Sequence, residues 1–172
     1  MDGKVVVIGS LNYDIILKTD RMPLKGETHN AESAQCCCGG KGGNHTLEQK
    51  DVDEIAHLLD GHTVLILQME IPVKVLEYAI KTAARAGCNI LFNMAPAMDF
   101  DETYMKMCHF LIMNEVEAQF YTGKEITSVP AARSGLTEFA GKMGNTCIFT
   151  LGKQGAMPDI QEVLDFRRKY SK

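Results

Sequence analysis

The 172-residue sequence lacks the features that mark membrane-bound and secreted proteins. No apolar run approaches the roughly 20 residues that a membrane-spanning helix needs. The short apolar run near the start is not followed by a small-residue cleavage pattern, so we expect no signal peptide. Internal repeats and low-complexity linkers are also missing, and the length is close to that of one domain. We therefore expect a single domain over residues 1–172 and no membrane partner.

Long basic stretches are missing as well. The chain has 18 Lys and Arg residues against 22 Asp and Glu residues, which gives a formal net charge of −4. Its longest basic cluster is Arg167-Arg168-Lys169, near the end of a predicted terminal helix, where cations complement the helix dipole. A net acidic chain without a Lys/Arg block binds nucleic acid poorly, so we expect no nucleic-acid partner.

The six cysteines contain no C-x-x-C pair. Three of them, Cys36, Cys37 and Cys38, are adjacent, and three adjacent side chains do not readily close on one tetrahedral zinc ion. Reduced thiols in a cytosolic protein are the better interpretation. We therefore expect a cytoplasmic protein.

What the sequence does contain is an ordinary globular composition, with 45 % hydrophobic and 23 % charged residues. Short β-branched runs alternate with longer segments of helical periodicity. This alternation predicts βαβ units and a mainly parallel sheet. Asp51 followed by Glu54 forms a capping-box pattern, and Pro158 is a typical first-turn residue of a helix. Strands are predicted over residues 4–10, 13–18, 33–38, 63–67, 89–93, 110–113 and 146–151, and helices over residues 51–60, 73–86, 101–108, 115–121, 131–143 and 158–170.

A glycine cluster, Gly39-Gly40-Lys41-Gly42-Gly43-Asn44, is the first candidate binding motif. Glycines let backbone N–H groups approach a polar ligand closely. The spacing matches neither the Walker A pattern nor the G-x-G-x-x-G dinucleotide pattern. On spacing alone, a flexible surface turn is the favoured interpretation of this segment.

The second candidate is Gly9-Ser10-Leu11-Asn12-Tyr13-Asp14, directly after the first predicted strand. Polar residues at the carboxyl end of a buried strand lie where open α/β sheets bind ligands. Asn12 and Asp14 are two residues apart, so in extended backbone they would lie on one side and suit adjacent sugar hydroxyls. An Asn/Asp turn with local backbone hydrogen bonds is an equally good interpretation of the motif by itself.

Taken together, these motifs resemble those of the ribokinases, which are members of the PfkB carbohydrate-kinase family. That family opens with G-S-x-N-x-D, then P-x-x-G-E-T, then G-G-K-G-x-N, and this chain has residues 9–14, 23–28 and 39–44 in the same order. Later segments resemble the family's L-Q-x-E, N-P-A-P-A, N-E-x-E-A and T-L-G-x-x-G patterns, in residues 67–70, 93–97, 114–118 and 150–155. The resemblance covers nearly the whole chain.

The resemblance implies ATP-dependent phosphorylation of D-ribose at its 5-hydroxyl, with Mg²⁺. It also implies an α/β fold with a ribokinase-like, mainly parallel sheet, helices on both faces and a partial β lid over about residues 15–38, through which homo-oligomers would form. The family's monovalent-cation site has no counterpart in this sequence. By position, the implied site residues are Asn12, Asp14, Gly40, Lys41, Asn44 and Glu70 for the sugar, Asn114, Thr150 and Gly152 for the nucleotide, and Glu117 for the Mg²⁺ shell.

Two departures from the family pattern predict missing internal segments, near residues 45 and 156. The second would have held the G-A-G-D motif, whose Asp takes the proton from the attacking hydroxyl in the family. No G-A-G-D occurs here, and Asp159 in Gly155-Ala156-Met157-Pro158-Asp159 lies one residue too late, so we assign no catalytic residue. A splice form, an error in the predicted gene or the omission of segments that are not ordered would each produce such a sequence.

The missing segments leave open which activity this chain retains. An inactive kinase chain is one interpretation. A non-catalytic remnant that binds sugar or a partner protein is another, and a kinase for another sugar or a nucleoside is the third. Because covering segments would be lost too, the sheet is expected to have unpaired edges and an uncovered face, and the chain to be marginally stable or oligomeric.

Overall fold

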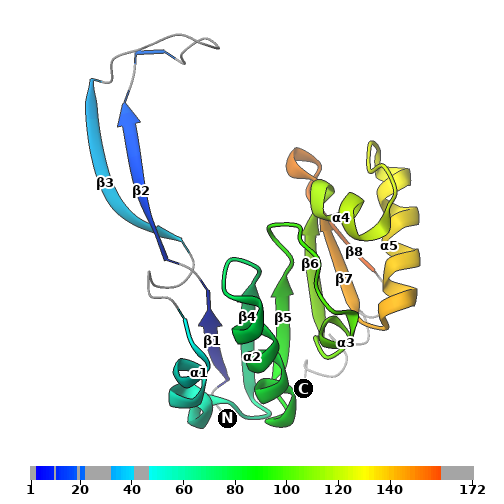
Figure 1. The fold of residues 1–172 in the computed structure, drawn as a ribbon. Coiled ribbons are helices and arrows are strands. Elements are labelled where there is room, and N and C mark those ends of the chain that lie inside the picture. Colours follow the sequence, from blue (N-terminus) through cyan, green and yellow to red (C-terminus); the bar gives the residue numbers. More distant parts are fainter. Residues whose placement is uncertain (1–2, 10, 19, 22–31, 41–46, 160–172) are drawn as a thin grey trace.

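The computed structural model describes residues 3–9, 11–18, 20–21, 32–40 and 47–159. A six-stranded sheet forms the body, in the order β1-β4-β5-β6-β7-β8, and β2 and β3 form a separate two-stranded ribbon (Figure 1). No helix among the described residues is long and apolar enough to cross a membrane. The strands are β1 (Lys4–Ile8), β2 (Leu11–Lys18), β3 (Ser33–Gly40), β4 (Thr63–Gln68), β5 (Asn89–Asn93), β6 (Phe110–Asn114), β7 (Thr146–Thr150) and β8 (Ala156–Pro158).

Five neighbouring strands of the body, β1 and β4 to β7, are parallel, and only β8 runs antiparallel to its neighbour β7. Consecutive strands are joined by helices, as the alternation of the sequence predicts. The expected α/β class and the mainly parallel sheet are therefore confirmed. The carboxyl ends of the parallel strands all meet at one edge of the sheet, where β1 leads into the ribbon.

The helices begin and end at residues with clear local causes. The Ser128 hydroxyl accepts from the Ala131 N–H at the start of α5, and Gly144 ends the helix with a φ of 76°, a conformation that glycine adopts without strain. The capping box of α1 lies one turn earlier than the predicted pair of Asp51 and Glu54. Glu48 is the N-cap residue, and Asp51 is its partner three residues later. The helices are α1 (Gln49–Ile55), α2 (Val73–Arg85), α3 (Glu102–Met105), α4 (Glu115–Thr122) and α5 (Val129–Met143), with short 3₁₀ turns η1 (Ala56–Leu58) and η2 (Gly152–Gln154).

The described helices cover one face of the sheet. The chain steps from β4 to β7 in one direction, and right-handed crossovers then place every connecting helix on the same side. Figure 1 shows α2 lying over β4 and β5. The strand residues under the helices are fully or almost fully buried, and they are Leu65, Leu67, Ile90, Phe92, Leu111, Met113, Cys147 and Phe149.

The alternate residues of the same strands lie on the opposite face, which we call the open face. They are exposed at β1 and mostly half-buried in the strands from β4 to β7, except that Gln68 and Thr146 are buried. Among the described residues no helix lies over this side, so the second helical layer that the fold class implies is not seen there. The apolar residues of the open face are Val5, Val7, Val64, Ile66, Leu91, Phe110, Ile112 and Ile148.

The chain after β7 differs from the prediction. Pro158 was expected to open a helix, but it is the last residue of β8, where it pairs with Ile148 of β7. A tight turn causes this: Leu151 N–H donates to Gly155 O at 2.7 Å, and Gly155 has a φ of 88°, which returns the chain along β7. The rest of the predicted terminal helix lies outside the described residues.

Three of the cysteines belong to the core under the helices. Cys88, Cys108 and Cys147 are buried. Burial raises the pKa of Cys108 to about 12, because the apolar surroundings penalise the thiolate. These thiols act as small apolar core residues rather than as nucleophiles.

Candidate functional site

The carboxyl edge of the sheet collects most of the polar motifs found in the sequence. Glu70 follows β4, Asn93 ends β5, Asn114 ends β6, and Thr150 ends β7 with Gly152 just beyond. Because these strands are parallel, residues far apart in the sequence meet at this edge, which is where open α/β sheets bind ligands.

The ribbon brings the two N-terminal motifs together at the same edge. In its antiparallel register Asn12 lies opposite Gly39, Leu11 opposite Gly40, and Asp14 opposite Cys37. The G-S-x-N-x-D segment and the start of the glycine cluster are thus neighbours in the backbone. Lys41 and Asn44, which were also predicted to bind sugar, lie outside the described residues. The ribbon extends from the end of β1, where the partial lid was expected (Figure 1).

Glu70 lies next to the strand that leads into the ribbon, because β4 pairs with β1 up to Ile8 and Leu67. Its side chain is exposed, and its Oε2 accepts from Gln68 Nε2 at 3.0 Å. The loop is fixed further by Met69 N–H, which donates to Ala95 O after β5 at 3.1 Å. The carboxylate of Glu70 is therefore held at the carboxyl edge of the sheet and is exposed to solvent.

Asn114 and Glu117 form the cap of α4. Asn114 Oδ1 accepts from the N–H groups of Val116 and Glu117, at 2.8 and 3.0 Å. Glu117 reaches back: its Oε2 accepts from Asn114 N–H at 2.6 Å, and its Oε1 from Asn114 Nδ2 at 2.8 Å. Glu117 is only 6 % exposed. Both residues predicted to lie near the nucleotide thus have a structural role in fixing the start of α4.

A pocket of about 260 Å³ lies beside this cap. Gly152 has a φ of 51°, and a Cβ at this position would come within 3.9 Å of Glu115 Oε1, so the backbone here runs close to that carboxylate. The pocket combines one cation, Lys153, with the acid Glu115 and two hydroxyl residues. Its lining residues are Glu115, Ile126, Thr127, Ser128, Leu151, Gly152, Lys153 and Gln154.

The sequence prediction placed Gly152 in this region but missed Glu115 and Lys153. Glu115 belongs to the N-E-x-E-A segment but was assigned no role, and Lys153 occupies a variable position of the T-L-G-x-x-G segment. The structure brings them together because β6 and β7 are adjacent and both end at this edge. Thr150, also predicted, is half-buried, and its Oγ1 donates to Met113 O at 3.4 Å, which ties β7 to β6.

Asp159 does not lie at this edge. Its N–H donates to Cys147 O at 3.0 Å, and Cys147 is near the amino end of β7. Because β8 runs antiparallel to β7, the chain has by then returned to the opposite end of the sheet. Asp159 therefore lies far from the carboxyl edge and cannot act there as the catalytic base. This agrees with the sequence analysis, which assigned Asp159 no catalytic role.

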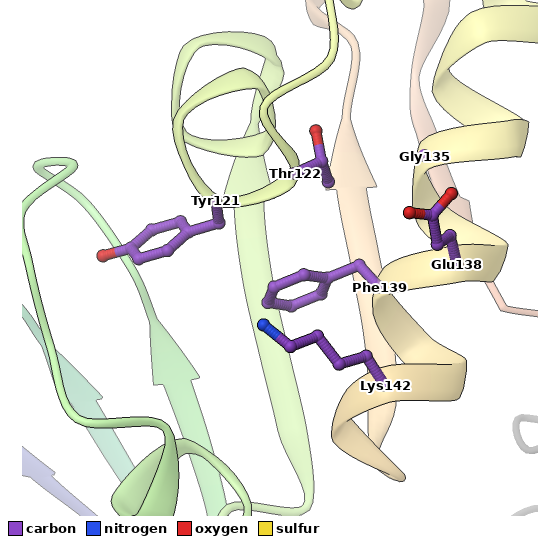
Figure 2. Close-up of a pocket in the computed structure, with 6 residues that line it drawn as sticks. All are labelled: Tyr121, Thr122, Gly135, Glu138, Phe139 and Lys142. Carbon is purple, nitrogen blue, oxygen red and sulfur yellow. The ribbon is translucent and has the colours of Figure 1, made fainter.

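Two further pockets lie among the helices, and no predicted site residue lines either of them. Figure 2 shows the smaller one, about 130 Å³, where Phe139 and Lys142 reach from α5 toward Tyr121 of α4. Tyr121 Oη donates to Met98 O at 2.7 Å, and burial raises the pKa of this tyrosine. Lys142 pairs with Glu102 across the neighbouring pocket. These contacts hold α3, α4 and α5 together on the covered face.

The chain is similar to known sugar kinases. The profile of the family described as "pfkB family carbohydrate kinase" matches residues 47–158. A deoxyribokinase of Salmonella typhimurium is 30% identical over 129 residues, which cover 74% of this chain and 42% of that protein. A ribokinase of Mus musculus is 31% identical over 118 residues, covering 67% of this chain and 36% of that protein. The chain thus spans less than half the length of these curated relatives.

Solved structures agree on the fold. The ribokinase of Arabidopsis thaliana, complexed with ribose and ATP, superposes with a TM-score of 0.70 at 18% identity, over 94% of this chain and 76% of that one. The ribokinase of Thermotoga maritima gives a TM-score of 0.68 at 19% identity, over 91% of this chain and 74% of that one. The arrangement of sheet, helices and ribbon is therefore that of the ribokinase fold.

Proposed function

The chain belongs to the pfkB family of carbohydrate kinases, and from this premise we propose that its sugar is ribose and that the 172-residue chain binds it without phosphorylating it. In the intact kinase the reaction would be transfer of the γ-phosphoryl group of ATP to the 5-hydroxyl of ribose. The chain would retain the sugar-binding part of that enzyme and part of its nucleotide site.

The observation that carries the sugar-binding proposal is the register of the ribbon. It sets Asn12 opposite Gly39, at the end of the strand that pairs with the Glu70 strand. Three parts of the chain that are distant in sequence thus converge on one edge. Carboxylates accept charge-assisted hydrogen bonds from hydroxyls, each stronger than a neutral bond, so Asp14 and Glu70 would contribute most to sugar binding.

The pocket between α4, α5 and η2 supports a nucleotide-phosphate site. Lys153 supplies a positive charge, and Gly152 has no side chain to keep a phosphate from the backbone. ATP supplies the phosphoryl group, and Mg²⁺ neutralises its charge when bound. Glu117 is buried with both oxygens engaged by Asn114, so its role toward Mg²⁺ would be indirect, while Glu115 lines the pocket itself.

Loss of catalysis follows from what the sequence lacks. Phosphoryl transfer depends on positioning and on charge stabilisation, and removal of one preorganised donor already slows such reactions by about a hundredfold or more. This chain has neither a G-A-G-D aspartate nor the glycine backbone that precedes it. Asp159, the nearest substitute in sequence, lies beside the amino end of β7.

Two measurements on the purified chain test the proposal. Isothermal calorimetry should detect ribose binding, and an assay coupled to ADP should give no more ribose-dependent signal than a sample without protein. Asp14→Ala should weaken ribose binding more than Lys41→Ala, because a carboxylate can accept from two hydroxyls. Ribose-dependent ADP release well above the blank would refute the loss of catalysis.

The choice of sugar needs its own comparison, since one relative is named a deoxyribokinase. Calorimetric titrations with ribose, 2-deoxyribose and adenosine should rank ribose first. Tighter binding of either other ligand would assign this chain to another substrate. If none of the three bound, the sugar-binding proposal would be wrong, and the rival interpretation, a remnant that acts only through protein contacts, would be favoured.

A further inference from the structure

The larger of the two pockets among the helices is walled by aromatic side chains. It lies where the loop before α3 meets α4 and α5, and its volume of about 410 Å³ is within the range of small-molecule sites. The aromatic residues that line it are Phe100, Phe120, Tyr121 and Phe139. A pocket of this size and composition is large enough to take a small organic ligand.

The aromatic walls are held in place by contacts within the chain. Phe139 is only 4% exposed, and its ring centroid lies 6.4 Å from that of Tyr121. The Tyr121 ring is fixed by the hydrogen bond from its hydroxyl to Met98 O, and it meets the Phe120 ring edge-on with centroids 5.0 Å apart. These rings therefore have their positions without any ligand, as preformed binding sites do.

The pocket also carries negative charge. Its lining contains two carboxylates, Asp99 and Glu102, and no lysine, arginine or histidine. Glu102 pairs with Lys142 of α5, and with Lys106 at 3.9 Å. Asp99 is exposed, and no cation within the described part of the chain pairs with it. The Asp99 carboxylate thus supplies a charge that a cationic ligand would neutralise.

Both the carboxylates and the rings favour a cation at this place. Burial raises the pKa of Tyr121, and the negative charges of Glu117 and Asp99 add to that rise, so Asp99 acts on the pocket wall. The face of an aromatic ring is also negative, and it attracts ammonium groups. One such contact is present in the neighbouring helix α3, where Lys81 Nζ lies 4.9 Å from the ring centroid of Tyr104.

We propose that this pocket binds a small organic cation of the alkylammonium class, at a site separate from the proposed sugar and nucleotide sites. The alkyl groups lie against the rings of Phe120 and Tyr121, and Asp99 supplies the counter-charge. The two carboxylates disfavour an anion. The aromatic walls disfavour a small metal ion, because they provide no oxygen ligands to replace its water.

Lys142 is the chain's own competitor for this site. Its ammonium pairs with Glu102 at the pocket, and both side chains are about half exposed, so the pair is weak. Removing the Lys142 charge leaves more of the Glu102 charge to the ligand. Lys142→Gln should therefore strengthen cation binding by about twofold, whereas a variant that only disturbed the packing of α5 would weaken it.

Choline and its uncharged carbon analogue, in which a tert-butyl group replaces the trimethylammonium group, are matched probes of the same shape. An NMR titration of the backbone amides should show saturable choline-dependent shifts in α3, α4 and α5, with a Kd of about 1–10 mM for so small a ligand. The carbon analogue should bind at least about threefold more weakly, because it lacks the attraction between cation and ring. Sodium chloride at equal concentration controls for ionic strength.

Two variants test the residues assigned to the site. Phe120→Ala removes a ring that is 48% exposed, and Asp99→Asn removes the counter-charge without changing the size of the side chain. Each should weaken choline binding by about two- to fivefold. Val116→Ala, at a residue of α4 that is 72% exposed, and Glu125→Gln, at an exposed acid, lie outside the pocket and should leave binding unchanged. Circular dichroism would confirm that all four variants fold.

Equal affinity for choline and its carbon analogue would overturn the proposal, because charge would then play no part in binding. So would choline shifts that do not saturate by about 50 mM. Unchanged choline binding in both Phe120→Ala and Asp99→Asn would also overturn it, since the ligand would then lie elsewhere. The signals of α3, α4 and α5 report on this pocket directly, so the result does not depend on whether the chain binds ribose.

Discussion

Leu111 and Ile112 are neighbours in β6 and have the same number of carbon atoms, yet they lie in opposite environments. Leu111 is fully buried beneath the helices, whereas Ile112 lies half-buried on the open face. The same contrast repeats along β4, β5 and β7. In a parallel sheet the residues on both faces are apolar. The composition of a strand alone therefore does not show which of its two faces lies under the described helices.

The largest change in the free energy of unfolding should come from shortening one of these two side chains to alanine. Leu111→Ala should lower the free energy of unfolding by about 2–5 kcal/mol, because it leaves a cavity in a packed core. Ile112→Ala should lower it by less than about 1.5 kcal/mol, since that side chain is only half-buried and loses less apolar burial. Urea unfolding of the two variants compares the losses.

Equal losses in the two variants would contradict the contrast between the faces. That result would mean that the open face is as well covered in solution as the helical face.

The sequence predicted the covered face better than the open one. The apolar periodicity of residues 73–86 located α2 to within one residue, and residues 115–121 located α4 equally well. The sequence sufficed for these helices because the spacing of apolar residues in an amphipathic helix indicates which side of it is buried. The run in residues 63–67 predicted β4 but not its environment, since a continuous apolar strand looks the same whether or not its second face is covered.

The errors have local physical causes. Pro158 satisfies the pattern of a helix start, but a strand at the sheet edge also tolerates a proline, and the turn at Gly155 decides the outcome. Helix α5 begins at Val129, two residues before the prediction, because the first turn of a helix accommodates Pro130 and Ser128 supplies the cap.

The candidate site was predictable where a motif lies at a strand end. Glu70 is at the carboxyl edge as its position after an apolar run implied, and the two N-terminal motifs meet through the ribbon. The pocket residues Glu115 and Lys153 were not predictable, because their proximity depends on the pairing of β6 with β7 rather than on any spacing in the chain.

The next effect concerns a buried polar residue on the helical side. Asn145 is 6% exposed, and its Nδ2 donates to Met105 O at 2.8 Å and to Cys108 O at 2.6 Å, which joins the end of α3 to the start of β7. Asn145→Ala should lower the free energy of unfolding by about 1–3 kcal/mol, because two carbonyls lose their donor. Urea unfolding measures this.

A matched change on the other face is Asn93→Ala at the end of β5, where the residue is half-buried with open-face parity. It should change stability by no more than about 0.5 kcal/mol. A loss from Asn93→Ala as large as that from Asn145→Ala would show that polar residues on the open face are also held in a closed environment.

A smaller effect should separate the two sides of helix α5. Gly141 is exposed, and a Cβ there would meet nothing within 4 Å, so Gly141→Ala should stabilise the chain by about 0.5–1 kcal/mol through helix propensity. At Gly135, which faces the sheet, a Cβ would lie 3.2 Å from Ile126 Cδ1. Gly135→Ala should therefore gain little or nothing, because Ile126 must move. Thermal unfolding of both variants checks the order, and a larger gain at Gly135 would contradict it.

The smallest effect lies at the exposed start of β1, which is the first strand in the order of the six-stranded sheet. Lys4 Nζ donates to Asp60 Oδ2 at 2.6 Å, which ties β1 to the turn before β4. This bond, followed by the N–H of His62 and the hydroxyl of Thr63, lowers the pKa of Asp60 to about 2. The folded pKa is thus below the value of about 3.9 expected in the unfolded chain.

The sign of the pH dependence follows from that shift. A carboxylate whose pKa is lower in the folded state stabilises the fold above pH 4, and this contribution is lost as the pH falls toward 2. The effect should be small and weaker in high salt, because both side chains are 44% exposed. Asp60→Asn should therefore flatten the fall in stability between about pH 5 and pH 2, and the gap from the parent should close near pH 2. Chemical unfolding across this range measures it, with Glu125→Gln as an exposed control. An unchanged slope in Asp60→Asn would show that Lys4 does not hold the edge of β1 through this carboxylate.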